Sequence, residues 1–183
     1  MGTLHADHAM PGDQAEGLPT SSATLPSLVV RMLRHGRLGD GLDTLDLGTG
    51  AGGLTAYAAH RLGDQRVTSL DVDPYLTSAA SGRLGRLGLH PKFVTADATR
   101  DIPGTYDRIV STVALAPGPG LCPVLGALRV GGRLVTILAR TMLIVTGWKD
   151  TNGEVVGQIE RDWAGASPAY RSRLVGAEPR AGS

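Results

Sequence analysis

The stretch Thr44-Leu45-Asp46-Leu47-Gly48-Thr49-Gly50-Ala51-Gly52-Gly53-Leu54 decides the fold. Its pattern predicts a short buried strand, a glycine-rich turn and the first turn of a helix. Glycines at 48, 50 and 52 let the backbone turn sharply and bring bare amides close to a ligand. The sequence therefore predicts a binding site at this turn, and the rest of the chain is placed around it.

The chain on both sides of the turn alternates between strand and helix patterns. Apolar residues recur at helical spacing over 25–35, with Thr24 expected as the N-cap and Pro26 in the first turn. Strands are expected at 43–47, 66–72, 92–95, 106–113 and 133–138. Helices are expected from the glycine turn to about 63, from 74 to 87 with Leu87 inward, and at 121–128.

The pattern changes after residue 140. Residues 142–147 and 155–159 read as two strands joined across Asn152-Gly153, which is a strong hairpin signal. The predicted fold is α/β, a doubly wound Rossmann-like sheet that is mostly parallel with an antiparallel C-terminal addition. We expect an N-terminal arm at 1–23, the folded domain at 24–161 and a C-terminal tail at 162–183.

Composition narrows the class of protein. The chain has 183 residues, 42% of them apolar, and a formal net charge of +1, which predicts one domain and no nucleic-acid partner. No apolar run approaches a membrane span, and the single cysteine, Cys122, forms no internal disulfide, so a cytoplasmic location is expected. His5-Ala6-Asp7-His8 has no third ligand cluster, so it is interpreted as a polar loop and no metal site is predicted.

Three aspartates help to decide between the two ligands that the glycine turn could bind. Gly48-x-Gly50-x-x-Gly53 also fits the dinucleotide pattern, and Asp71, about twenty residues on, suits the ribose of either ligand. Asp46 lies inside the strand, which is unfavourable near a pyrophosphate but suits a cationic amino group, and Asp97 can accept a hydrogen bond from an exocyclic amine. Carboxylates after three neighbouring strands favour S-adenosylmethionine over NAD.

These residues resemble the class I S-adenosylmethionine-dependent methyltransferases through the glycine motif, Asp71 and Asp97. More narrowly, the chain is similar to the protein-L-isoaspartate O-methyltransferases at three stretches: His5 to Pro11, Ala23-Thr24-Leu25-Pro26, and Gly131 to Val135. Thr24 and Leu25 stand where that family has Ser and Gln.

Two further stretches, Thr20-Ser21-Ser22 and 70–77, resemble the actinobacterial branch that methylates an aspartate of a ribosomal peptide. That resemblance implies carboxyl methylation of an aspartyl or isoaspartyl residue in a protein or peptide.

The resemblance also implies roles for individual residues. The cofactor set comprises Asp46, Gly48, Thr49, Gly50, Gly52, Asp71, Val72, Asp97 and Ala98. Thr24 is the expected catalytic residue, orienting the carboxylate. The substrate set comprises Ser22, Thr24, Ser111, Thr112 and Ala116. A carboxylate with a pKa near ~4 is already a nucleophile at neutral pH, so no general base is expected.

Two other functions stay open from the sequence. One is a methyltransferase that acts on a small molecule, with the arm as a lid over an enclosed apolar pocket. The other is a truncated copy that binds cofactor or a partner without turnover, which the short N-terminal region and the change at Thr24-Leu25 favour.

Overall fold

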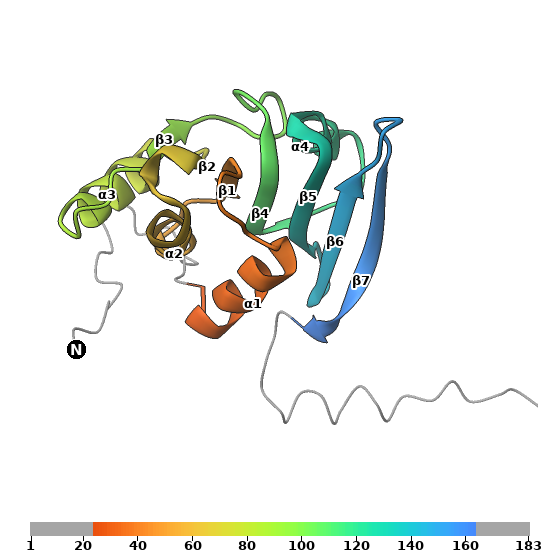
Figure 1. Ribbon diagram of the computed structural model, residues 1–183, viewed down its shortest axis with the longest axis horizontal. Helices are drawn as coiled ribbons and strands as arrows, with labels where there is room; N and C mark the ends of the chain where they lie inside the picture. Colours follow the sequence, from red (N-terminus) through yellow and green to blue (C-terminus); the bar gives the residue numbers. More distant parts are fainter. Residues whose placement is uncertain (1–23, 164–183) are drawn as a thin grey trace, which may run out of the picture.

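The computed structural model describes residues 24–163, which form one seven-stranded sheet with the order β3-β2-β1-β4-β5-β6-β7 (Figure 1). Five strands are parallel: β1 (Thr44–Leu47), β2 (Val67–Asp71), β3 (Lys92–Thr95), β4 (Tyr106–Leu115) and β5 (Leu128–Leu138). The last two, β6 (Leu143–Lys149) and β7 (Val155–Trp163), are antiparallel. The predicted α/β sheet with an antiparallel C-terminal addition is confirmed.

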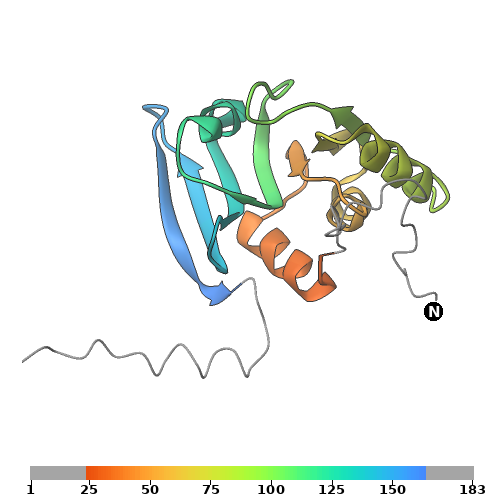
Figure 2. The ribbon, with the colours of Figure 1, turned by 180° about the vertical axis from the view of Figure 1, so that it is seen from behind.

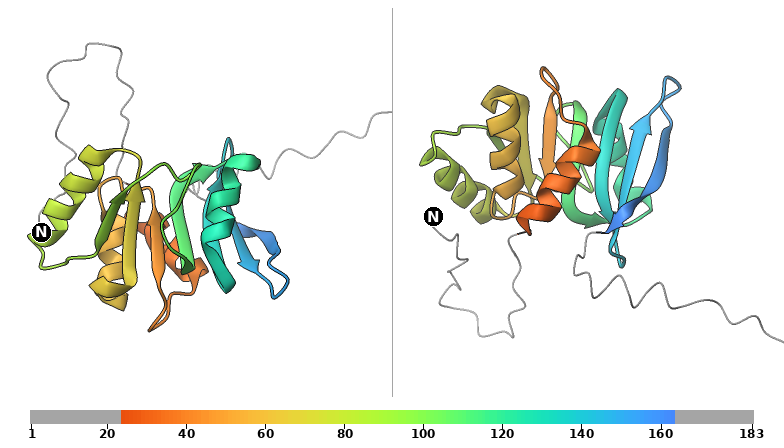
Figure 3. Two further views of the ribbon diagram at one scale, coloured as in Figure 1. Left: turned by 90° about the horizontal axis from the view of Figure 1, so that it is seen from above. Right: turned by 60° about the horizontal axis from the view of Figure 1, so that its bottom comes forward.

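Helices cover the two faces of the sheet unequally, as Figures 1 and 2 show from opposite sides. The α-helices are α1 (Pro26–Gly36), α2 (Gly53–Leu62), α3 (Pro74–Gly85) and the short α4 (Cys122–Ala127), with 3-10 turns η1 (Asp64–Arg66) and η2 (Pro119–Leu121). Helix α1 lies between α2 and the β6–β7 pair, as the right panel of Figure 3 shows.

Two apolar clusters lie on opposite faces of the central strands. One joins Met32 of α1 and Leu54 of α2 to Val110, Val135 and Ile144 of the sheet. The other packs α4 and the segment before β4 against the alternate residues of β1, β4 and β5. Successive side chains of a strand point to opposite faces, so β1 sends Leu45 and Leu47 into the second cluster and Asp46 toward the α2 side.

Several local predictions are corrected by the structure. Thr24 does not cap α1: Leu25 is the N-cap residue, without a side-chain hydrogen bond, and Pro26 is the first helical residue. Leu87 is 70% exposed because α3 ends at Gly85, before the helical pattern does. Strand β5 begins at Leu128, five residues earlier than expected, and β7 continues to Trp163, past the predicted domain end.

The hairpin between β6 and β7 has the predicted turn. The Gly153 amide donates to the Asp150 carbonyl at 3.1 Å, and Gly153 has φ +84°. Lys149, the last residue of β6, extends across to α4 and donates to the main-chain carbonyls of Leu125 and Leu128, at 2.9 Å each. The antiparallel addition is thereby tied to the helix before β5.

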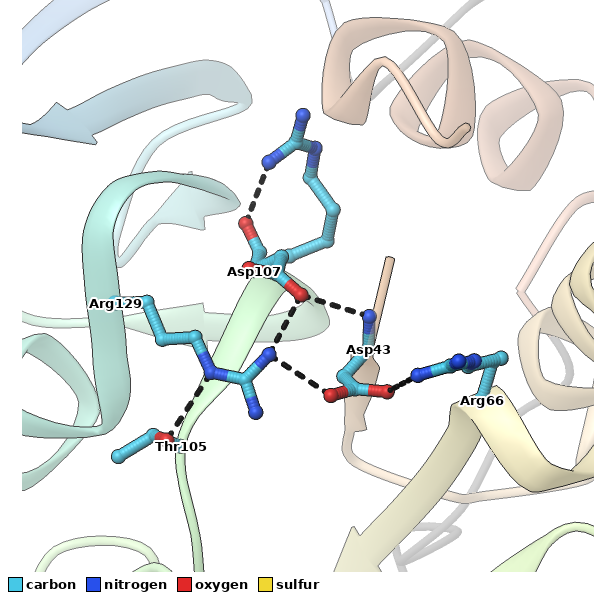
Figure 4. A network of polar contacts seen from close by, with 6 residues as sticks. Asp43, Arg66, Thr105, Asp107 and Arg129 are labelled. Atoms are coloured by element: carbon cyan, nitrogen blue, oxygen red, sulfur yellow. Dashed lines mark hydrogen bonds and ion pairs between the residues drawn. The ribbon is translucent and has the colours of Figure 1, made fainter. Parts of the chain in front are cut away.

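A polar network ties together the edge of the sheet where the parallel strands begin, here called the amino edge (Figure 4). Arg129 Nη1 donates to Asp43 Oδ2 at 2.8 Å and to Asp107 Oδ2 at 2.7 Å. Arg66 Nη1 donates to the other oxygen of Asp43 at 2.9 Å. The pKa of Asp43 is lowered, first by the hydrogen bond from Arg66 and then by that from Arg129. The network fixes the starts of β1, β4 and β5 relative to one another.

Within residues 24–163, none of the helices combines the length and the apolar character needed to span a bilayer. The same residues contain no grouping of three or more His, Cys, Asp or Glu suited to a metal ion. Cys122 lies at the start of α4, is exposed and is not disulfide-bonded.

Candidate functional site

The glycine turn lies where β1 ends, at the carboxyl edge of the parallel strands. The amides of Gly48 and Thr49 donate to the Leu70 carbonyl of β2, at 2.8 and 3.3 Å. Gly48 has φ +94°, and a Cβ added there would lie 2.2 Å from Cγ2 of Val113 in β4. A side chain is therefore excluded at Gly48 both by its backbone conformation and by its neighbour.

A second close approach occurs at Gly52, which has φ +85°. A Cβ at this position would lie 3.2 Å from that of Ala80 and 3.0 Å from Leu84, both in α3. Gly52 is also the N-cap of α2. Its lack of a side chain therefore allows α3 to pack against the beginning of α2, where main-chain amides gather at the carboxyl edge.

Asp71, the last residue of β2, is held beside the glycine turn. Its Oδ2 accepts the Gly50 amide at 3.1 Å, and its Oδ1 accepts the Asp73 amide at 3.1 Å. Each carboxylate oxygen keeps further acceptor capacity, and the residue is partly exposed. The structure thus brings together two residues of the predicted cofactor set, Asp71 and Gly50, that are 21 positions apart.

Asp46 is fully buried beneath α2. Its Oδ2 accepts the hydroxyl of Thr55 at 2.5 Å and lies 3.4 Å from that of Ser69, while Thr49 Oγ1 lies 2.7 Å from Ser69 Oγ. Burial raises the pKa of Asp46 to about 7, against the hydrogen bonds from Thr55 and Ser69, which lower it. Within residues 24–163, Asp46 Oδ1 has no hydrogen-bond partner. This buried acceptor lacks a hydrogen-bond donor, which a cationic group of a ligand would supply.

Asp97 follows β3 at the same edge. Its Oδ1 accepts the amide of Thr99 at 2.9 Å and its hydroxyl at 2.7 Å, and its Oδ2 lies 3.3 Å from Nε of Arg100. The Thr99 hydrogen bonds, more than Arg100, lower its pKa, so it is a carboxylate at neutral pH. Beside it, Ala98 packs on the apolar cluster under α4, while Val72 after β2 is 68% exposed.

The predicted substrate residues are distributed unevenly. Ser22 lies outside the described residues. Thr24 precedes α1 and is partly exposed. Ser111 is buried and its hydroxyl donates to the Val113 carbonyl at 2.8 Å, so that hydroxyl already has a main-chain partner. Thr112 is half-buried and Ala116 is exposed, both at or just beyond the end of β4.

Sequence reasoning missed Thr55 and Ser69, and it missed the contact of Val113 with Gly48. Thr55 and Ser69 are fully buried and supply the hydroxyls around Asp46. The sequence could have indicated both, because each is a hydroxyl residue at a core-facing position of its helix or strand. Val113 gave no such signal, since its contact with Gly48 joins residues far apart in the sequence.

The histidines and lysines of the described residues gather at one edge of the sheet. Among residues 24–163, the histidines and lysines lie toward the amino edge: His35 in the last turn of α1, His60 in that of α2, and Lys92, His90 and Lys149 near the beginnings of β3, β2 or β5. Asp46, Asp71 and Asp97 lie at or near the ends of β1, β2 and β3, at the opposite edge. Two arginines lie at the same edge, since Arg83 donates to the Ala51 carbonyl and Arg100 lies beside Asp97. That edge combines carboxylate acceptors with a glycine turn and holds no histidine or lysine of the described range.

Comparison with known proteins agrees with this geometry. Residues 44–123 match the family model described as a methyltransferase domain. This match covers less than half of the chain. The sheet has the Rossmann-like arrangement of a solved methyltransferase, so the predicted fold is confirmed.

Relatives of the methyltransferase domain fall into more than one group. A ribosomal protein L11 methyltransferase from Pelobacter propionicus is 39% identical over 110 residues, which cover 57% of this chain and 35% of that protein. A protein-L-isoaspartate O-methyltransferase from Dinoroseobacter shibae is 32% identical over 132 residues, 70% of this chain and 59% of the relative. A solved protein-L-isoaspartate O-methyltransferase superposes with a TM-score of 0.65 at 24% identity, over 91% of this chain and 56% of the other.

This last likeness shows the fold alone. The chain spans 32% and 30% of the first two ribosomal protein L11 methyltransferases that it matches.

Proposed function

We propose that this chain is an S-adenosylmethionine-dependent O-methyltransferase that acts on an aspartyl or isoaspartyl carboxylate of a protein or peptide. One observation carries the proposal: Asp46, Asp71 and Asp97 lie at or near the ends of three neighbouring strands, and Asp71 is hydrogen-bonded to the glycine turn. That arrangement suits a cationic, nucleoside-bearing ligand better than a pyrophosphate.

The residues present fit S-adenosylmethionine. The unpartnered buried Oδ1 of Asp46 matches an ammonium group, and Gly48 leaves no side chain above the turn. Asp71 would accept from the ribose hydroxyls, with Val72 beside it, and Asp97 with Ala98 would take the adenine edge. When bound, the cofactor supplies a methyl group activated by a sulfonium. The chain's own contribution is to bind, orient and exclude water.

A carboxylate acceptor is supported by what the carboxyl edge holds. If the methyl group were transferred to an ammonium group of the substrate, that group would first have to lose a proton. A histidine or lysine of the protein would serve as the base for this step. The histidines and lysines of the described range lie at the other edge, whereas a carboxylate is ionised at neutral pH without help. Catalysis would then rest on alignment, with Thr24, Thr112 and Ala116 holding the acceptor.

Methylation of an amine of a ribosomal protein is the second candidate. A ribosomal protein as substrate is favoured by the 39% identity over 110 residues to a relative named as a ribosomal protein L11 methyltransferase. An amine product is stable to mild base, while a methyl ester is hydrolysed, so one chemical step separates the two candidates.

The test is mass spectrometry of peptides incubated with the full chain and S-adenosylmethionine. One peptide carries isoaspartate, a second aspartate, and a third only lysine as a nucleophile. A gain of about 14 Da on the first or second, lost in mild base, is the expected result. A base-stable gain on the third supports the amine alternative, and absence of cofactor binding by calorimetry overturns both.

Asp71→Ala provides the variant for this assay, because it removes both acceptors at the end of β2. Cofactor affinity should fall by about a hundredfold, equivalent to roughly 2.7 kcal/mol. Asp101→Asn, an exposed residue after β3, is the control and should bind as the unaltered chain does.

A further inference from the structure

A second concave site lies on the α1 side of the sheet, between the second half of α1 and the strands β5 to β7. Its cavity has a volume of about 310 Å³ and is lined by Arg31, Arg34, His35, Arg37, Arg133, Gln158 and Glu160. It continues into a neighbouring hollow of about 340 Å³ along β7, where Arg161 joins the lining. A cavity of this size accommodates a small ligand.

The lining is strongly cationic. Arginine side chains come from α1, from the residue after it, from β5 and from β7, and the one carboxylate among the lining residues is Glu160. These five arginines are scattered along the sequence, and folding brings them together around the cavity and its neighbouring hollow. Arg31, Arg34 and Arg37 form no ion pair with a carboxylate of residues 24–163, whereas Arg66 and Arg129 at the neighbouring network are paired with Asp43 and Asp107.

Glu160 is already engaged within the protein. Its Oε1 accepts the Thr146 hydroxyl at 2.6 Å and the Gln158 amide at 3.0 Å, and its other oxygen lies 3.7 Å from Nδ1 of His35. Nη2 of Arg133 lies 3.7 Å from Oε1 of Glu160, which is long for an ion pair. The single carboxylate therefore does not balance the guanidinium groups around it.

Arg133 is a rigid donor at this site. Only 14% of its side chain is exposed, and its Nε and Nη2 donate to the His35 carbonyl at 2.6 Å and the Thr146 hydroxyl at 3.2 Å. Burial, followed by the charge of Arg37, lowers the pKa of Arg133. A guanidinium fixed by two hydrogen bonds and repelled by its neighbour gains more from an added anion than a solvated one does.

We propose that this cavity binds a phosphate group, with Arg133 at its floor and Arg31, Arg34 and Arg37 at its rim. The planar fork of arginine matches a phosphate, and a dianion compensates several guanidinium groups at once. The shared chemistry is that of free phosphate and of a small phosphomonoester. The proposal does not rest on the proposed methyl transfer, since this cavity lies away from the glycine turn and its test measures no methylation.

Equilibrium dialysis of the full chain at physiological ionic strength tests the proposal. Labelled inorganic phosphate is one arm and glycerol 2-phosphate the other, and we expect a Kd below about 1 mM for at least one. Tighter binding of the ester identifies an organic phosphate as the ligand, and equal binding identifies free phosphate.

The variants separate a built site from general charge. The triple change Arg31→Gln, Arg34→Gln and Arg37→Gln should weaken binding at least tenfold. The change Arg61→Gln, Arg86→Gln and Arg140→Gln removes the same charge elsewhere on the surface and should leave binding unchanged. The triple change Arg31→Lys, Arg34→Lys and Arg37→Lys keeps the charge, removes the planar guanidinium groups and should bind phosphate less well than the unaltered chain.

Three results overturn the proposal. The first is no phosphate binding at 10-fold the expected Kd. The second is equal weakening in the charge-matched control. The third is binding of a short RNA with none of either small phosphate, which would make the surface a polyanion contact instead.

Discussion

Replacing Gly48 with alanine measures how far the binding turn depends on glycine. A left-handed backbone strains a residue that has a Cβ by about 1–3 kcal/mol. The new Cβ also meets Val113 Cγ2 at 2.2 Å. Val113 is 51% exposed, so it can rotate away, at about 0.5–1.5 kcal/mol for an unfavourable rotamer. Together these effects predict that Gly48→Ala lowers the free energy of unfolding by about 2–4 kcal/mol.

Urea denaturation followed by circular dichroism gives this quantity, and a double-mutant cycle divides it. Val113→Ala in the Gly48→Ala background should recover only the steric part, about 1 kcal/mol, and leave the backbone strain. Gly53→Ala is the matched control, because a Cβ there meets nothing within 4 Å and α2 begins at that residue. It should be neutral or stabilise by up to about 1 kcal/mol. A loss below about 0.5 kcal/mol in Gly48→Ala, or full recovery by Val113→Ala, would refute the reasoning.

Three further predictions concern buried or paired groups. The folded state retains a proton on Asp46 that the unfolded chain releases from about pH 4. As the pH rises from 3.8 to about 7, this residue should therefore lower the free energy of unfolding by on the order of 4 kcal/mol. Asp46→Asn should flatten this pH dependence in urea titrations, and Asp101→Asn should not. Arg129→Met should destabilise by about 1 kcal/mol at pH 7, after allowance for its partial exposure. Because the pKa of Asp43 is lowered, that loss should vanish as pH falls through the folded pKa, and a constant loss down to pH 2 would contradict the assignment. Lys149→Met should lower the thermal midpoint by leaving two carbonyls near α4 without their donor, with a free energy of about 1–3 kcal/mol, while cofactor affinity measured by calorimetry stays unchanged.

Regular patterns made most of the fold predictable. The alternation of strands and helices gave the parallel sheet, and Asn152-Gly153 gave the hairpin, because both signals are local. Errors arose where tertiary structure decides the boundary. Strand β5 was expected to begin at Arg133, but it begins at Leu128 and carries an irregularity before Arg133, with Tyr106 paired to Leu128 and Arg108 to Arg133.

The acidic residues of the candidate site were predictable from the sequence, whereas the residues that pack against them were not. Asp46, Asp71 and Asp97 follow from their positions at strand ends, and the hydrogen bond between Asp71 and Gly50 places two of the predicted residues together. The hydroxyls around Asp46 and the contact of Val113 with Gly48 depend on packing between segments far apart in the chain. The same holds for the arginines of the second cavity, which come from three separate stretches of the chain.

The arginines around the second cavity have a consequence for the speed of association. Five guanidinium groups and one carboxylate line the cavity and its neighbouring hollow, so the local field there is positive. Such a field attracts an approaching phosphate before contact. The arrival rate of the phosphate would therefore decline as added salt shortens the range of the field, whereas that of an uncharged ligand would not.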